Sequence, residues 1–113
     1  MEIDAHRINE VLVMRLLLGG AERGKIDGVQ SLVREHLSAG TLRFIVDLDG
    51  CQWIDSSGLG ELVKSLVAVM RQGGNLKLSG VSPRLRNVLE VTNLTSVFEI
   101  YPNEAAALES YVR

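Results

Sequence analysis

The chain opens with an alternation of apolar and polar positions that is typical of a β-strand. Ile3, Ala5 and Ile8 alternate with Glu2, Asp4 and His6. A second β-rich run covers residues 11–18, and Asn9-Glu10 between the two runs has the character of a turn. The first 18 residues therefore predict a β-hairpin.

Two later segments have the spacing of an amphipathic helix. The first covers residues 25–37, where apolar side chains recur every three or four positions until Gly40 ends the pattern. The second follows Asp55 and is the more regular of the two. Its apolar residues have spacings of 3, 1, 3, 1 and 3 and occupy an arc of about 140°: Leu59, Leu62, Val63, Leu66, Val67 and Met70.

This second helix makes a specific prediction about packing. Charged and small residues take the opposite face, and Gly73-Gly74 supply a C-terminal stop. We therefore expect Leu62, Leu66 and Met70 to face a sheet.

Short apolar runs between the helices predict further strands at residues 44–48, 76–78 and 97–100. Two more helices begin at proline-containing signals: Ser82-Pro83 reads as an N-cap and first helical residue, and Asn103 after Pro102 reads as a cap. The resulting order is β-β-α-β-α-β-α-β-α. It predicts a single α/β domain over residues 1–113, with helices packed on a mixed sheet of four to five strands.

Composition excludes several classes of function. The net charge of the 113-residue chain is −2, and its basic residues are scattered, so we expect no nucleic-acid partner. Cys51 is the single cysteine, which rules out an internal disulfide and a cysteine-rich metal site. No apolar run approaches ~18 residues, so we expect no membrane insertion. With acidic rather than basic residues at the start, the sequence favours a cytoplasmic protein.

The segment Asp55-Ser56-Ser57-Gly58-Leu59-Gly60 is the most distinctive motif, because it stands between a strand-like stretch and the best helix. Ser56 or Ser57 as an N-cap would explain one hydroxyl at this position. Capping does not explain Gly58 and Gly60, each of which costs the helix ~1 kcal/mol. Close approach of another chain, or access by a modifying enzyme, would explain both glycines, and the residues alone leave the two readings open.

A rival reading concerns Asp47 and Asp49, which follow a buried strand-like run. An apolar strand that ends in Asp-x-Asp resembles the nucleophile motif of haloacid-dehalogenase-type phosphatases, which work with Mg²⁺. Those enzymes need further acidic ligands, a lysine and a longer fold, and this chain has no later acidic pair after a strand. A polar strand end before a turn is therefore the favoured interpretation, with no catalytic metal expected.

The motif at residues 54–60 is similar to the signature of STAS-domain anti-sigma factor antagonists. Three further blocks match in the expected order: Gly73-Gly74-Asn75-Leu76-Lys77-Leu78, Ser82-Pro83-Arg84-Leu85 and Leu94-Thr95-Ser96-Val97-Phe98-Glu99-Ile100. Members of this family often carry an aspartate in the loop after the second strand. This chain reads Gly19-Gly20-Ala21-Glu22-Arg23 there, and Glu22 is the residue that could take that place.

The resemblance implies a regulatory role without catalysis, metal or cofactor. It implies that the unphosphorylated protein binds an anti-sigma serine kinase, that the kinase phosphorylates Ser56, with Ser57 as second choice, and that a serine phosphatase resets it. The implied partner-binding residues are Asp55, Ser56, Ser57, Gly58, Leu59, Gly60 and Glu22. Other STAS domains act as subunits of phospholipid ABC transporters or of stress-signalling scaffolds, and these alternatives stay open, as does an oligomeric state.

Overall fold

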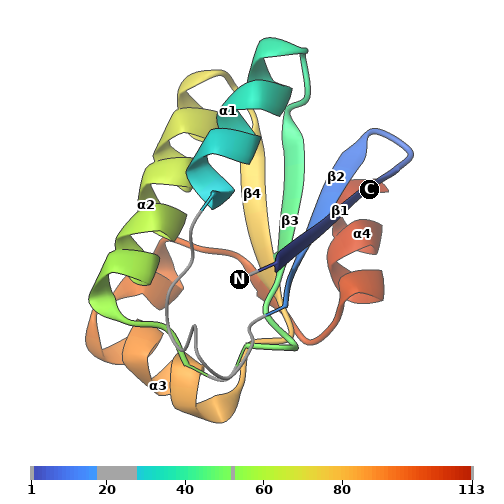
Figure 1. The fold of residues 1–113 in the computed structure, drawn as a ribbon. Helices are drawn as coiled ribbons and strands as arrows, with labels where there is room; N and C mark the ends of the chain where they lie inside the picture. Colours follow the sequence, from blue (N-terminus) through green and yellow to red (C-terminus); the bar gives the residue numbers. More distant parts are fainter. Residues whose placement is uncertain (1, 18–27, 52, 113) are drawn as a thin grey trace.

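The computed structural model describes residues 2–17, 28–51 and 53–112, and within these residues five strands form one mixed sheet (Figure 1). The strand order is β1-β2-β3-β4-β5; β1 and β2 are antiparallel, and each later pair is parallel. In chain order the elements are β1 (Glu2–Ile8), β2 (Val11–Leu17), α1 (Val29–Ser38), β3 (Arg43–Asp47), α2 (Ser56–Arg71), β4 (Asn75–Ser79), α3 (Pro83–Val91), a 3₁₀ helix (Leu94–Ser96), β5 (Ile100–Tyr101) and α4 (Glu104–Val112). The predicted α/β fold with a mixed sheet of four to five strands is confirmed, and the sheet has five.

The predicted hairpin is formed by β1 and β2, which are joined at Asn9 and Glu10. Asn9 has a φ of +56°, in the left-handed region that asparagine enters more readily than most residues. This turn closes the hairpin between Ile8 and Val11, which face each other across the two strands.

Helices cover both faces of the sheet, with α1 and α2 on one face and α4 on the other (Figure 1). The larger core lies beneath α1 and α2, and α3 adds two buried leucines to it at the end of the sheet. The smaller core lies beneath α4 and contains four buried residues: Val11, Val13, Ile45 and Ala107. Alternate residues of β2 and β3 supply the two cores, as the period of two along a strand requires.

The buried face of α2 differs in part from the predicted one. Leu62 and Leu66 are buried as expected, whereas Met70 is 57% exposed and that part of the prediction was wrong. Ser65 and Val69 are buried in its place. At 100° per residue, Val69 lies about 20° from Leu62 around the helix and Met70 about 80° away, so Met70 falls at the margin of the packed face.

The last strand is shorter than the predicted residues 97–100. It starts at Ile100, and the 3₁₀ helix precedes it. The amide of Phe98 donates to the carbonyl of Leu94 (3.0 Å), so the backbone at Phe98 bonds locally. Bonding to β4 begins at Glu99, whose carbonyl accepts from the N–H of Leu78 (2.9 Å). Burial of the Phe98 ring anchors this turn in the larger core. At the start of α1 the described helix begins at Val29, and the predicted residues 25–27 lie outside the described part of the chain.

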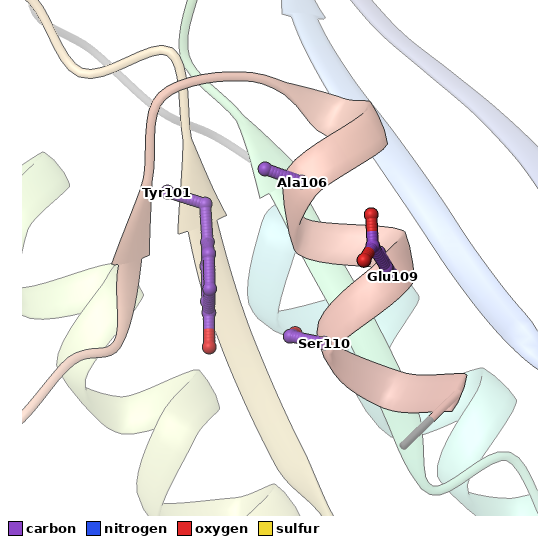
Figure 2. A pocket seen from close by; sticks show the side chains of 4 residues that line it. All are labelled: Tyr101, Ala106, Glu109 and Ser110. Atoms are coloured by element: carbon purple, nitrogen blue, oxygen red, sulfur yellow. The ribbon is translucent and has the colours of Figure 1, made fainter.

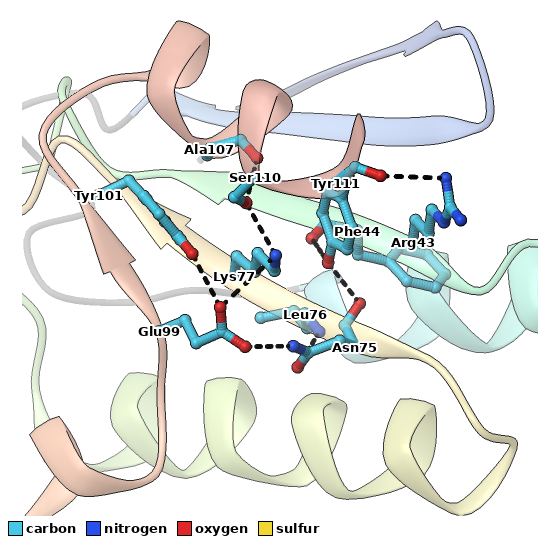
Figure 3. A network of polar contacts seen from close by, with 10 residues as sticks. All are labelled: Arg43, Phe44, Asn75, Leu76, Lys77, Glu99, Tyr101, Ala107, Ser110 and Tyr111. Carbon is cyan, nitrogen blue, oxygen red and sulfur yellow. Dashed lines mark hydrogen bonds and ion pairs between the residues drawn. The ribbon is translucent and has the colours of Figure 1, made fainter. Parts of the chain in front are cut away.

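Helix α4 is fastened to the sheet by polar contacts as well as by the smaller core (Figure 3). The hydroxyl of Tyr111 lies 2.9 Å from the carbonyl oxygens of both Phe44 and Asn75, and burial raises its pKa, so it stays a donor. The Nζ of Lys77 donates to the hydroxyl of Ser110 (2.7 Å) and lies 3.9 Å from the centre of the Tyr111 ring. These contacts hold the C-terminal half of α4 in place.

A shallow hollow of about 430 Å³ opens between Tyr101 and this half of α4, where it is lined by Ala106, Glu109 and Ser110 (Figure 2). Ser110 already donates to the carbonyl of Ala107 and accepts from Lys77. We therefore assign the hollow to the packing of α4 and look for the functional site elsewhere.

Candidate functional site

The predicted motif lies where the chain leaves the larger core and begins α2. Cys51 and Ile54 are buried in that core and fix the approach of the chain. Asp55 then adopts an extended conformation, with φ −81° and ψ 178°, and Ser56 is the first helical residue. The chain is thus held in the core just before the motif, and the first two helical residues, Ser56 and Ser57, are exposed.

Asp55 caps α2, so the reading in which Ser56 or Ser57 serves as the N-cap does not hold. Its Oδ1 accepts from the backbone N–H of Gly58 (2.8 Å) and from the hydroxyl of Ser57 (2.9 Å). Aspartate and serine are about equally good caps, and the position where the extended stretch ends selects Asp55. The helix therefore does not need either serine hydroxyl for its cap.

Both serines are exposed, but their hydroxyl groups differ. The Ser57 hydroxyl donates to Asp55. Among the residues that the structure describes, the Ser56 hydroxyl has no hydrogen-bond partner. Ser56 consequently presents the more available nucleophile of the two.

The remaining motif residues contribute in different ways. Gly58 is buried, so its part is the backbone N–H that Asp55 accepts, and Leu59 is partly buried against the larger core. Gly60 is partly exposed, and a Cβ built on it would meet nothing within 4 Å. Packing among the described residues therefore does not require glycine at position 60.

A hollow of about 570 Å³ separates the N-terminal ends of α1 and α2. It is lined by Gly28, Gln30, Ser31, Ser56, Ser57, Gly60, Glu61 and Lys64. The backbone N–H of Gln30 donates to Glu61 Oε1 across this hollow (3.4 Å), which satisfies one of the free amides at the start of α1. In the described part of the chain, the side of α2 next to the serines is thus open and mostly hydrophilic.

Trp53 is a site candidate that the sequence interpretation missed. It is the chain's single tryptophan and lies three residues before Ser56. Its side chain is large and apolar, yet 37% of the residue's surface is exposed. The guanidinium carbon of Arg84, at the start of α3, lies 5.9 Å from the centre of its ring, within the range of a cation–π contact. A large aromatic residue beside the motif was the available signal, since exposed tryptophan and arginine are frequent anchors of protein interfaces.

The rival pair, Asp47 and Asp49, lies at the C-terminal end of β3 and beyond it. Asp47 Oδ1 accepts from the backbone N–H of Asp49 (3.0 Å). Arg15 and Glu104 line the same small hollow and form an ion pair there. Within the described residues, no group of three or more histidine, cysteine, aspartate and glutamate side chains is placed to hold a metal ion. Around the two aspartates the structure thus shows the Arg15–Glu104 ion pair and a backbone hydrogen bond.

Two further predictions concern Glu22 and membrane insertion. Glu22, the predicted acidic residue of the loop after β2, lies outside the described residues. No helix in the described part of the chain has the length and apolar character to cross a membrane.

Comparisons with known proteins agree with the resemblance seen in the sequence. A model of the STAS domain matches residues 2–107. The anti-sigma F factor antagonist of Paenibacillus polymyxa is 30% identical over 109 residues, which cover 96% of this chain and 91% of that protein. The anti-sigma-B factor antagonist of Bacillus subtilis is 38% identical over 53 residues, which cover 47% and 49%.

Solved structures share the fold at lower identity. An anti-sigma-factor antagonist (STAS) domain protein from Planctomyces limnophilus superposes with a TM-score of 0.82 at 22% identity and covers 98% of each chain. The Bacillus cell fate determinant SpoIIAA in its phosphorylated form superposes with a TM-score of 0.74 at 19% identity, covering 99% of this chain and 100% of that one. With a family match over nearly the whole chain and the same fold, this protein belongs to the STAS domain family.

Proposed function

We propose that this chain is an anti-sigma factor antagonist that binds an anti-sigma serine kinase through the start of α2 and is released when the kinase phosphorylates Ser56. A serine phosphatase would restore the binding form. The names of relatives such as the Paenibacillus polymyxa protein support the antagonist role. The observation that carries the site is the cap: Asp55 satisfies the helix start, and Ser56 is left exposed beside it.

Geometry favours Ser56 over Ser57 as the phosphorylated residue. Phosphoryl transfer needs a hydroxyl that can approach the γ-phosphate in line. Transfer to Ser57 would first have to break its hydrogen bond to Asp55, and that bond also positions the carboxylate that caps Gly58. Ser57 is therefore the second choice.

A phosphate on Ser56 should change binding more than folding. It adds about −1.5 to −2 charges. The free amides at the start of α2 favour negative charge by ~0.3–2 kcal/mol, so the helix tolerates the group. A partner shaped for a neutral hydroxyl would instead bury a poorly paired dianion beside Asp55. Such mispairing costs about 2–5 kcal/mol, or roughly 30- to 4,000-fold in affinity.

The proposed contact surface extends from the serines in two directions. On one side Gly60 leaves the hollow between α1 and α2 open, so a partner can approach the helix backbone. On the other side Trp53 and Arg84 offer an aromatic face and a guanidinium at the start of α3. A central anchor of this type contributes 2 kcal/mol or more to a typical interface, so we expect Trp53→Ala to weaken binding by roughly 30-fold.

The test begins with the kinase captured from the native host by the unphosphorylated chain. Incubation with this kinase and ATP, followed by mass spectrometry, should place phosphate on Ser56. Titration should then show that Ser56→Asp binds the kinase about 30-fold or more weakly than wild type, whereas Ser56→Ala binds and cannot be switched off. Ser57→Ala is the matched control and should still accept phosphate.

Two outcomes would defeat the assignment. One is phosphate on another residue in the wild-type chain. The other is Ser56→Asp binding as tightly as wild type although its melting temperature is unchanged. Capture of an ATP-binding transporter subunit in place of a kinase would support the transporter alternative.

A further inference from the structure

A charged cluster joins the sheet to the first turn of α4. The Arg15 guanidinium of β2 binds the Glu104 carboxylate at two points, Nε to Oε2 at 2.5 Å and Nη2 to Oε1 at 3.0 Å. Its Nη1 also lies 3.5 Å from Asp4 Oδ2 of β1. A hollow of about 260 Å³ lies among Arg15, Asp47, Asp49, Gly80, Pro102, Asn103 and Glu104. Residues of β1, β2 and β3 and of the first turn of α4 therefore form one charged cluster.

Asp47 is crowded in this cluster. Its Oδ1 accepts from the backbone of Asp49, and a Cβ built on Gly80 would lie only 2.9 Å from the same atom. The Asp47 and Glu104 carboxyl groups line the same hollow and lie close enough for each to shift the pKa of the other. Two carboxyl groups that face one small hollow are most stable when one of them holds a proton, because like-charge repulsion is then removed and a hydrogen bond can form between them.

We propose that Asp47 and Glu104 share one proton in the folded chain and that this proton fastens the first turn of α4 to β3. Glu104, held at two points by Arg15, is the carboxylate of the pair, and Asp47 is the protonated donor. The motif Asp47-Leu48-Asp49 thus has a role as a proton-dependent clamp. Loss of the proton leaves two adjacent negative charges and loosens the start of the helix.

The charged groups around the pair support this division of roles. Burial and the hydrogen bond to Glu104 raise the pKa of Asp47 to about 6, and the nearby Asp49 adds to this. The hydrogen bonds from Arg15 lower the pKa of Glu104 to about 2, and His6 of β1 adds to this. Asp4, also of β1, faces Arg15 and competes weakly for it. The two titration steps belong to the coupled pair and not to either residue alone.

The sign of the pH effect follows from these shifts. In the unfolded chain both carboxyls titrate near ~4. Because the pKa of Asp47 is raised in the fold, its contribution to stability is present at low pH and is lost as pH rises from about 4 through about 6. Because the pKa of Glu104 is lowered, its contribution is present above about 4.5 and is lost as pH falls through about 2. The pair therefore stabilises the fold most near pH 4 to 5.

The effect should be local to one end of α4. Its other end is held by Lys77 and Tyr111, which bind Ser110 and the carbonyl groups of the sheet (Figure 3). Loss of the shared proton should consequently loosen the turn that contains Glu104 and leave the turn that contains Ser110 in place.

Asp47→Asn tests the clamp, because the amide keeps the shape, the acceptor and a permanent donor toward Glu104. The wild-type melting temperature should fall between pH 4.5 and 7.5, whereas that of the variant should stay nearly level. At pH 7.5 the variant should melt about 2–4 °C higher, a modest shift because the site is partly exposed to water. Asp49→Asn is the matched control, because it keeps the backbone contact to Asp47 and removes only one neighbouring charge. Its melting temperature should still fall between pH 4.5 and 7.5, by somewhat less than that of the wild type.

Hydrogen exchange gives a local readout in the wild-type chain. Between pH 5 and 7.5, corrected for the intrinsic pH dependence, protection should fall at residues 104–108 and hold at residues 109–112. If Asp47→Asn does not fold, carboxyl NMR titration of the wild type decides the question. A parallel pH profile for wild type and variant, or an Asp47 carboxyl that titrates below pH 4, would overturn the proposal.

Discussion

Helices α2 and α3 start in similar ways but use serine for opposite purposes. At the start of α3 the Ser82 hydroxyl oxygen accepts from the backbone N–H of Leu85 (3.1 Å), and Pro83 follows as the first helical residue. At the start of α2 the carboxylate of Asp55 accepts from the N–H of Gly58 (2.8 Å). One helix thus uses a serine as its cap, whereas the other is capped by an aspartate and leaves the exposed Ser56 hydroxyl outside the cap.

The difference shows how the proposed phosphorylation of Ser56 would leave the helix stable. A substituent on Ser82 would fall on the atom that caps α3, so folding and modification would compete. A substituent on Ser56 leaves the Asp55 cap untouched. Placing the cap one residue before the serine separates the stability of the helix from the chemistry of the hydroxyl.

The largest effect on stability in this comparison should come from Asp55→Ala. The change removes the acceptor for the Gly58 N–H and for the Ser57 hydroxyl at once. Loss of an aspartate cap typically costs about 1–2 kcal/mol, and we expect a fall of that size in the free energy of unfolding. Urea denaturation measures it, and Asp55→Asn, which keeps the acceptor, should recover most of the loss. Equal losses for alanine and asparagine would show that the cap is not the source of the stability.

Ser82→Ala should have the next largest effect, about 1 kcal/mol, because it leaves the Leu85 N–H at the start of α3 without its acceptor. Urea denaturation again measures the change, with Ser82→Asp as the control that restores an acceptor. If Ser82→Ala were as stable as wild type, the proposed contrast between the two helix starts would lose its reference point.

Helix α4 has a side-chain cap as well, from Asn103. Of the caps at α2, α3 and α4, the sequence alone predicted those of α3 and α4. Ser82 before Pro83 and Asn103 before Glu104 each offered one suitable residue at an unambiguous boundary, and both cap their helices. At α2 three suitable residues stand in a row, and their intrinsic preferences are about equal. Asp55 is the cap because the buried stretch that includes Ile54 ends immediately before it. Burial in the core is a tertiary effect, and the intrinsic capping preferences of the residues do not include it.

Tertiary packing also explains the wrong predictions for Met70 and for the strand at residues 97–100. Met70 is apolar and near the predicted face, but the sheet supports only the narrower side of α2 that carries Leu62 and Val69. Residues 97–100 have strand-like composition, yet Phe98 packs into the core from a turn. The helix start at which the motif stands was located correctly, because the periodicity of α2 is regular from Leu59 onward. The role of the motif as a binding site stays a prediction.

Gly60→Ala should have a smaller effect, of the opposite sign. Its Cβ would meet no atom within 4 Å, and alanine favours a helix by about 0.5–1 kcal/mol, so the fold should become more stable. Binding to the captured kinase should weaken, because the methyl group narrows the hollow beside the serines. Gly74→Ala is the contrast: its Cβ would lie 2.2 Å from the Leu42 carbonyl oxygen, so it should destabilise the fold. A Gly60→Ala variant that is less stable than wild type would mean that the fold needs this glycine.

Ser56→Ala should have the smallest effect on stability, within about 0.5 kcal/mol, as is usual for exposed positions without a structural contact. Ser57→Ala should cost slightly more, since it removes the hydroxyl that donates to Asp55 from an exposed position. Thermal melts of the two variants and of Ser82→Ala compare three serines. Ser82 is itself a cap, Ser57 donates to a cap residue, and Ser56 takes no part in a cap. If Ser56→Ala destabilised the chain as much as Ser82→Ala, the Ser56 hydroxyl would have a structural role, and its phosphorylation would disturb the fold as well as the interface. A near-zero change, together with loss of switching by the kinase, would show that Ser56 serves the partner and Ser82 serves the fold.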